Sequence, residues 1–216
     1  MAAMPKAGIT YSKKKIEKTD FKALREAAER AVTVELGRIA RPDDRIERAA
    51  EIIRQADAEV ALHLDDRDKA VASLWFYEHV PGLAGAIGVT PTAYREVLSK
   101  AFYGGPERVR TGSGHYELRP VPDLPGPELV EAVREAGVPF VEDADEKLPK
   151  LATVVAEARA RRGAAVVFMR DAALALSEEP YGWDGPRIAE HAGVQKKLIW
   201  QQQAAARAAR DCAAKL

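Results

Sequence analysis

The chain has 216 residues, 47% of them apolar, which is enough to form one large or two small hydrophobic cores. Lysine plus arginine equal aspartate plus glutamate at 33 each, which excludes attraction of nucleic acid by net charge alone and requires local segregation of charge instead. The single cysteine, Cys212, excludes an internal disulfide. No apolar run is long enough to cross a bilayer or to form a signal peptide. We therefore expect a cytoplasmic protein without membrane contact.

The first segment, residues 1–19, reads as a flexible basic arm. Residues 1–24 contain six lysines against two acidic residues, and three of the lysines are consecutive: Lys13, Lys14 and Lys15. Such an arm could follow the phosphates of DNA, or it could be a solubilising tail without a partner. Both interpretations stay open at this point.

Three helices are predicted between residues 20 and 79. Asp20 offers an N-cap for the first, which runs to about Ile39. The second has apolar residues at helical spacing from Ile46 to Val60, and we expect it to end at the acidic pair Asp65-Asp66. The third, 67–79, carries the aromatic run Trp75-Phe76-Tyr77.

A glycine motif follows these helices in the stretch LAGAIGVTPTAYREV. Gly88 has a small residue four positions before it, Ala84, an apolar residue five before it, Leu83, and Tyr94 six after it. A small residue at this spacing permits close contact between two helices, and a glycine can adopt the positive φ of a tight turn between them. We call this stretch the Gly88 motif, and it predicts a helix-turn-helix.

The same motif recurs near the end of the chain in RIAEHAGVQKKLIWQQ, where Gly193 is preceded by Ala189 and Ile188 and followed by Ile199. We call this stretch the Gly193 motif. Arg67-Asp68 lies before Gly88 much as Arg170-Asp171 lies before Gly193, at separations of 21 and 23 residues counted from the arginines. We therefore interpret the two segments as copies of one repeated motif.

These two segments, 67–102 and 170–209, resemble the helix-turn-helix units of actinobacterial regulators, which are similar to region four of sigma factors. The resemblance rests on R-D-x-A, an amphipathic helix, a loop containing glycine, and then I-A-x-x-x-G-V followed by a helix with a polar start. It implies a DNA-binding protein that regulates transcription.

A short β-hairpin is expected after the first helix-turn-helix. Val109 and Tyr116–Leu118 flank a glycine-containing turn, which is typical of a hairpin and would place a wing beside the first helix-turn-helix. The fold class is therefore mostly α, with two helix-turn-helix units in tandem and a winged helix in the first. The expected division of the chain is an arm at 1–19, a first helical domain at 20–119, a proline-rich linker at 120–127 and a second helical domain at 128–216.

The residues expected to bind DNA are exposed polar side chains on the second helix of each motif, in the hairpin and in the arm. Glutamine and lysine can recognise base edges in the major groove, and arginine can contact guanine or phosphate. The set comprises Thr90, Thr92, Arg95, Glu96, Arg108, Arg110, Gln195, Lys196, Lys197, Trp200, Gln201, Lys13, Lys14 and Lys15. The alternative is that both motifs are ordinary helical core with solvated polar faces.

The sequence offers little for catalysis. Its four histidines are scattered without the spacing of metal ligands, and the acidic segment 141–146 lacks the spacing of a calcium loop and reads as a solvated loop. Trp183, in the stretch YGWDG, reads as a packing residue between helices. We therefore expect no enzyme, no cofactor and no metal.

The expected function is sequence-specific binding of double-stranded DNA by a transcriptional regulator. Alternatives are a plasmid or phage protein that organises or partitions DNA, and a helical adaptor that contacts RNA polymerase or a sigma factor through the Trp75-Phe76-Tyr77 helix and the acidic segment. The recognition residues of the two motifs differ, so a monomer is expected to bind a non-palindromic site, with residues 120–127 setting the distance between its two parts. The oligomeric state does not follow from the sequence.

Overall fold

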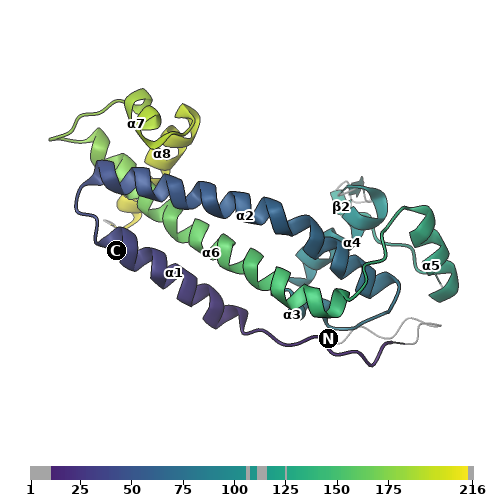
Figure 1. Cartoon of the computed structure of the whole chain (residues 1–216). Coiled ribbons are helices and arrows are strands. Elements are labelled where there is room, and N and C mark those ends of the chain that lie inside the picture. The colour runs from purple at the N-terminus through teal and green to yellow at the C-terminus, as the bar shows by residue number, and fades with distance from the viewer. Residues whose placement is uncertain (1–10, 106–107, 111–115, 125, 214–216) are drawn as a thin grey trace. The chain divides into compact units, whose positions relative to one another are not determined.

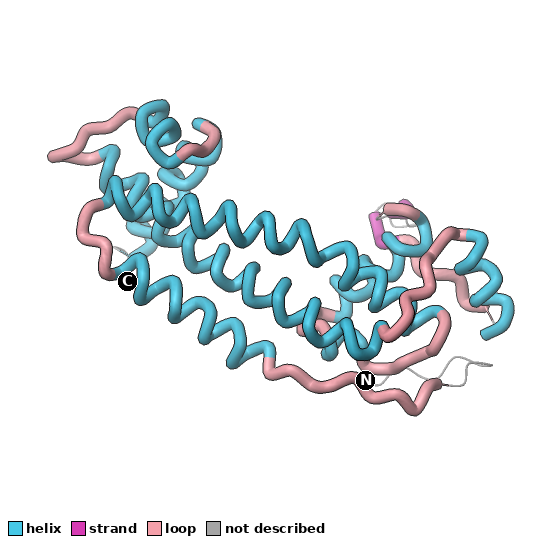
Figure 2. Tube along the Cα trace, in the orientation of Figure 1, coloured by secondary structure: helices cyan, strands magenta, loops and turns pink. Residues whose placement is uncertain are grey.

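The computed structural model describes residues 11–105, 108–110, 116–124 and 126–213. Its described residues are mostly helical with one small antiparallel sheet, which confirms the predicted class at that level (Figures 1 and 2). The elements are α1 (Phe21–Gly37), α2 (Pro42–Phe76), α3 (Leu83–Ala86), α4 (Pro91–Tyr103), β1 (Arg108–Arg110), β2 (Tyr116–Leu118), α5 (Gly126–Glu135), α6 (Ala144–Ser177), α7 (Gly185–Ala192) and α8 (Lys196–Ala213).

The described residues form two compact units, each built from both halves of the sequence. Unit 1 combines the described part of 1–21 with 62–155, and unit 2 combines 22–61 with the described part of 156–216. Each of the long helices α2 and α6 contributes one of its ends to unit 1 and the other end to unit 2. This division differs from the consecutive one expected from the sequence, and residues 120–127 lie inside unit 1 instead of between two domains.

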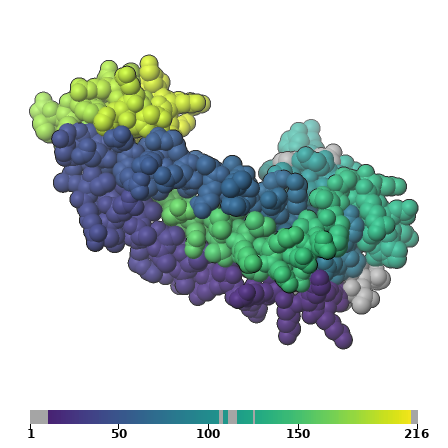
Figure 3. All heavy atoms as spheres, in the orientation of Figure 1, coloured from purple at the N-terminus to yellow at the C-terminus, as the bar shows by residue number. Residues whose placement is uncertain are grey.

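Unit 2 is held together by a core to which five helices contribute. Its buried residues come from α1, from the first part of α2, from the second part of α6 and from α7 and α8; among them are Leu36, Ile46, Met169, Ile188 and Ile199, each fully buried. In Figure 3 the atoms of α7 and α8 lie directly against the beginning of α2. Burial of large apolar side chains contributes about 1.5–3 kcal/mol each to folding, so this core orients the α7/α8 pair.

Unit 1 packs around aromatic side chains at the end of α2 and just after it. Phe76 is fully buried, and its ring centroid lies 6.0 Å from that of Phe102. The hydroxyl of Tyr77 donates to the carbonyl oxygen of Val138 over 2.7 Å. The indole of Trp75 meets the ring of Tyr94 edge-on at 6.4 Å. The aromatic run of the sequence is therefore internal packing of this unit.

Two predicted helix boundaries are wrong. Residues 42–76 form one helix, where the acidic pair Asp65-Asp66 predicted an end. Both aspartates are exposed, and Asp65 pairs with Lys69 one turn further on, so the acidic pair is accommodated on the helix surface without a break. The acidic segment 141–146 is likewise only partly a loop, because α6 begins at Ala144 and its first turn includes Asp145 and Glu146, where the helix dipole favours negative charge.

The expected hairpin is present. Strand β1 pairs antiparallel with β2, with Arg108 opposite Leu118 and Arg110 opposite Tyr116. The turn predicted between the strands, 111–115, lies outside the described residues. Both strands are mostly exposed to solvent.

Candidate nucleic-acid interface

The Gly193 motif forms a helix pair with a well-defined start and turn. The carboxylate of Asp184 accepts a hydrogen bond from the backbone N–H of Arg187 over 2.9 Å, which caps α7, and Pro186 occupies its first turn. At the other end Gly193 has φ +64°, in the left-handed region that glycine adopts readily. Ile188, Ala189 and Ala192 face the core. The turn expected at this glycine is confirmed.

A side chain and a backbone carbonyl of α2 fix the position of this turn. Arg54 Nη1 donates to the carbonyl oxygen of Ala192 over 3.1 Å, which satisfies one of the free carbonyls at the end of α7. His191 Nε2 lies 3.2 Å from the carbonyl oxygen of Asp43. The Asp43 carboxylate is bound by Arg41, which holds its pKa below the usual range. The turn is thus anchored to α2 at two points.

Trp183 packs beside the core of unit 2. The Arg187 guanidinium lies 4.2 Å from the centre of the indole, and the imidazole of His191 meets it edge-on at 5.3 Å. This placement agrees with the interpretation of Trp183 as a packing residue between helices.

The first turns of α8 present a polar and basic face to solvent. Ile199 is fully buried and Leu198 half-buried, which turns the remaining side chains outward. The exposed members are the five that were expected here from the sequence: Gln195, Lys196, Lys197, Trp200 and Gln201. We call this set the α8 face. Over its length α8 holds four basic residues against one acidic residue, Asp211, so the local charge is positive although the chain is neutral.

Trp200 has a defined position on this face. It is 57% exposed, which is high for an indole. Its Nε1 lies so near Gly185 that an added Cβ there would be 2.6 Å away. The indole therefore lies against the first residue of α7 with much of its surface in solvent.

The Gly88 motif has the same local plan in unit 1. Gly88 has φ +63°, and the Thr90 hydroxyl accepts from the backbone N–H of Ala93 over 3.2 Å, with Pro91 next in the chain. Tyr94 packs inward against Trp75, and burial raises the pKa of its phenol, so it stays neutral. The turn and the cap expected here are both confirmed.

The exposed residues of this motif are fewer. Thr90, Thr92 and Arg95 are exposed at the start of α4, whereas Glu96 is half-buried. Arg108 Nη2 lies 3.8 Å from a carboxylate oxygen of Glu96, so the hairpin and α4 share an ion pair. Arg110 is exposed on the same strand as Arg108. Glu96 is therefore a residue that joins the hairpin to the helix, in addition to any contact with a base.

The described part of the basic arm, residues 11–19, contacts other segments of unit 1. The backbone N–H of Ser12 donates to the carbonyl oxygen of His79 over 3.2 Å, and the ring of Tyr11 lies 6.4 Å from that of Trp75. The ammonium group of Lys14 is 2.7 Å from Glu78, whose carboxylate raises the pKa of Lys14. Lys13 and Lys15 are exposed. Of the three lysines, Lys14 is therefore already engaged in an ion pair within the protein.

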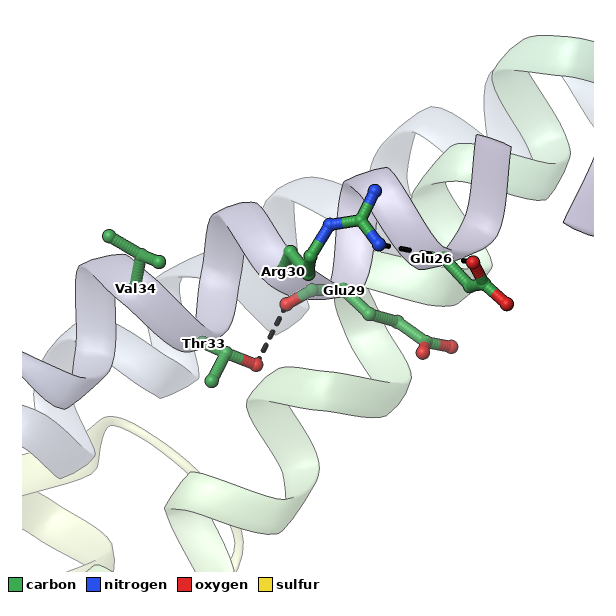
Figure 4. Close-up of a pocket in the computed structure, with 5 residues that line it drawn as sticks. All are labelled: Glu26, Glu29, Arg30, Thr33 and Val34. Atoms are coloured by element: carbon green, nitrogen blue, oxygen red, sulfur yellow. Dashed lines mark hydrogen bonds and ion pairs between the residues drawn. The ribbon is translucent and has the colours of Figure 1, made fainter. Parts of the chain in front are cut away.

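Other kinds of site find little support in the part of the chain that the structure describes. No group of three or more His, Cys, Asp or Glu side chains there is arranged to hold a metal ion. No described helix is long and apolar enough to span a membrane. A groove on α1 is lined by Glu26, Glu29, Arg30, Thr33 and Val34, all from one helix (Figure 4). Within the described chain, no second element closes this groove over the five residues.

The residues that orient the α7/α8 pair carry no signal in the sequence. Arg54 and Asp43 lie 138 and 148 residues from their partners, Ala192 and His191, and no local pattern marks them. Compared with protein-family models, with curated proteins and with solved structures, the chain matches none.

Proposed function

We propose that the protein is a sequence-specific double-stranded DNA-binding protein that regulates transcription. In this proposal the Gly193 and Gly88 motifs are two helix-turn-helix units, α8 and α4 are their recognition helices, and the hairpin is a wing beside the first. The observation that carries the proposal is the α8 face, a solvated set of lysine, glutamine and tryptophan side chains at the start of a helix that follows an anchored glycine turn.

The chemistry of the α8 face suits the major groove. Lysine can bind the O6 and N7 atoms of guanine, and glutamine can form two hydrogen bonds with adenine. Lys196 and Lys197 also provide positive charge that attracts the phosphates of DNA. The α8 face holds no carboxylate that would repel those phosphates.

The anchoring of the α7/α8 pair supports base recognition as distinct from loose electrostatic contact. Hydrogen bonds to bases require side chains held in place by their own surroundings. Here Ile199 is buried in the core of unit 2, and Arg54 binds the last carbonyl of α7. The recognition residues therefore start from a fixed backbone.

The rival proposal of a helical adaptor lacks the surface that it needs. Phe76 is fully buried, and Trp75 and Tyr77 are occupied by interactions inside unit 1. A protein that organises or partitions DNA uses the same chemistry as a regulator, so the pattern of genomic binding separates them. A regulator would occupy a few sharp sites, and an organising protein would give broad coverage.

The test is selection of bound duplexes from random DNA, followed by measurement of affinity across a salt series. We expect one recurring non-palindromic sequence, and a slope of log affinity against log salt close to 0.9 for each phosphate neutralised. Replacing Lys196 and Lys197 by alanine should weaken recognition of one part of the site, and Arg95→Ala the other part, by about 1–3 kcal/mol for each base that is no longer recognised.

The matched control is the double variant Lys22→Ala, Arg134→Ala, which removes two positive charges at exposed side chains without changing the α8 face. It should bind the selected site nearly as the wild type does. The proposal fails if the protein binds no duplex at low salt. If the selected site is a perfect inverted repeat bound by a dimer, and the Lys196 and Lys197 changes have no effect on it, the Gly193 motif is structural.

A further inference from the structure

A second candidate site lies in unit 1, in a groove between the second part of α2 and the first turns of α6. The groove has a volume of about 430 Å³, within the range of small-molecule sites. Asp66 and Lys69 line it from α2, and Lys147 and Lys150 from α6. Residues three apart lie on the same face of a helix, so each wall presents its pair of charged side chains to one space. We call this space the lysine groove.

The lysine groove is positively charged. Three ammonium groups face one carboxylate, that of Asp66. Lys69 Nζ is 2.7 Å from a carboxylate oxygen of Asp65, whereas Lys147 Nζ donates to an uncharged group, the carbonyl oxygen of Glu142, over 2.7 Å. Among the described residues no hydrogen bond or ion pair engages the ammonium group of Lys150. Lys147 and Lys150 are thus available to an anion.

The remaining lining is apolar. Ala70 is buried, and Leu151 and Val141 are half-buried. The backbone N–H of Val141 donates to the buried hydroxyl of Ser73 over 2.9 Å, which holds this wall in place. A ligand in the groove would meet apolar surface on one side and ammonium groups on the other.

We propose that the lysine groove binds a small organic anion with an apolar body, such as an acyl or aromatic carboxylate or phosphate ester. Lys147 and Lys150 bind the anionic group, and Ala70, Val141 and Leu151 contact the apolar body. This inference is independent of DNA binding by the α8 face, because the groove is in unit 1 and the α8 face is in unit 2.

The test uses the full chain and the fluorescent anion 8-anilinonaphthalene-1-sulfonate, which combines an aromatic body with a sulfonate. Its affinity is measured by titration, and competitors are then added at equal concentration: octanoate, inorganic phosphate and neutral octanol. We expect octanoate to displace the probe best, because it alone combines charge with an apolar chain. Displacement by inorganic phosphate as good as by octanoate, or by octanol as good as by octanoate, would overturn the proposal.

The variant test is the charge reversal Lys147→Glu, Lys150→Glu, which we expect to weaken probe binding about tenfold. The matched control, Lys18→Glu with Lys100→Glu, changes net charge equally at two exposed lysines outside the groove and should keep the affinity within about twofold. If the reversal disturbs folding, as judged by circular dichroism, Lys147→Gln with Lys150→Gln removes the charges without repulsion and should weaken binding about fivefold. Unchanged binding in the folded groove variant contradicts the site.

Discussion

The strongest structural prediction concerns Gly88, where a methyl group would meet two separate obstacles. The residue has φ +63°, which costs an L-residue about 1 kcal/mol relative to glycine. A Cβ added there would also lie 2.4 Å from Cγ of Phe21 and within 2.8 Å of two further ring atoms. Phe21 is only 7% exposed, so its ring has little room to move.

The expected cost of Gly88→Ala is the sum of these terms. Overpacking of a core side chain adds about 1–3 kcal/mol to the backbone term, for a total of about 2–4 kcal/mol. In a chain of this size each kcal/mol lowers the melting temperature by about 2–4 °C. Gly82→Ala is the matched control, because Gly82 also has a positive φ, +78°, but has no atom within 4 Å of an added Cβ. It should lose about 1 kcal/mol.

The assay is urea unfolding followed by far-ultraviolet circular dichroism for the wild type, the single variants Gly88→Ala, Gly82→Ala and Phe21→Ala, and the double variant Phe21→Ala, Gly88→Ala. Removing the ring should reduce the cost of the second change to that of the control, since the clash then disappears while the backbone term remains. Equal destabilisation by Gly88→Ala and Gly82→Ala, or an unchanged cost in the Phe21→Ala background, would refute the contact between Gly88 and Phe21.

Three further predictions concern stability, each with its own comparison. Ile199→Ala should lower the free energy of unfolding by about 2–5 kcal/mol, because the Ile199 side chain is fully buried. Leu62→Ala, at a side chain that is 69% exposed, should change it by less than about 0.5 kcal/mol. The midpoints of urea unfolding compare the two variants. Asp184→Ala should lower the free energy of unfolding by about 1 kcal/mol, because α7 loses its N-cap. Asp184→Ser should keep most of that stability, since serine also caps helices, and equal losses in both variants would argue against the cap. Arg41 lowers the pKa of Asp43, so the folded carboxylate contributes stability above the ordinary aspartate pKa of about 3.9 and loses it as the pH falls through its lower native pKa. Asp43→Asn should therefore lose less stability than the wild type between about pH 5 and pH 2, and a carboxyl NMR titration that gives Asp43 a pKa of 4 or higher would contradict this.

Local features of the structure were predictable because they depend on neighbours in the sequence. The positive φ at Gly88 and Gly193, the cap at Thr90 and the antiparallel strands at 108–110 and 116–118 all follow from short patterns. The outward direction of Lys196 and Lys197 follows from the apolar spacing of their helix.

Features that depend on distant partners were not predictable in the same way. The acidic pair at residues 65–66 resembles a helix end, although residues 42–76 form one helix whose two ends belong to different units. Glu96 reads as a free acceptor in the sequence but has Arg108 nearby in space. The chain positions that close unit 2, Arg54 and Ala192, are separated by 138 residues, far beyond the reach of any periodicity.

The composition of the two units sets an order for folding during synthesis. Unit 1 ends at residue 155, so all of its segments are translated before residue 156. Unit 2 begins with α1 and the first part of α2, but its core also needs Ile188 and Ile199, which come near the end of the chain. The apolar faces of α1 and early α2, including Leu36 and Ile46, therefore lack part of their core until Ile188 and Ile199 have been translated. The nascent chain thus has all segments of unit 1 before it has all those of unit 2, although α1, which belongs mainly to unit 2, precedes most of unit 1 in the sequence.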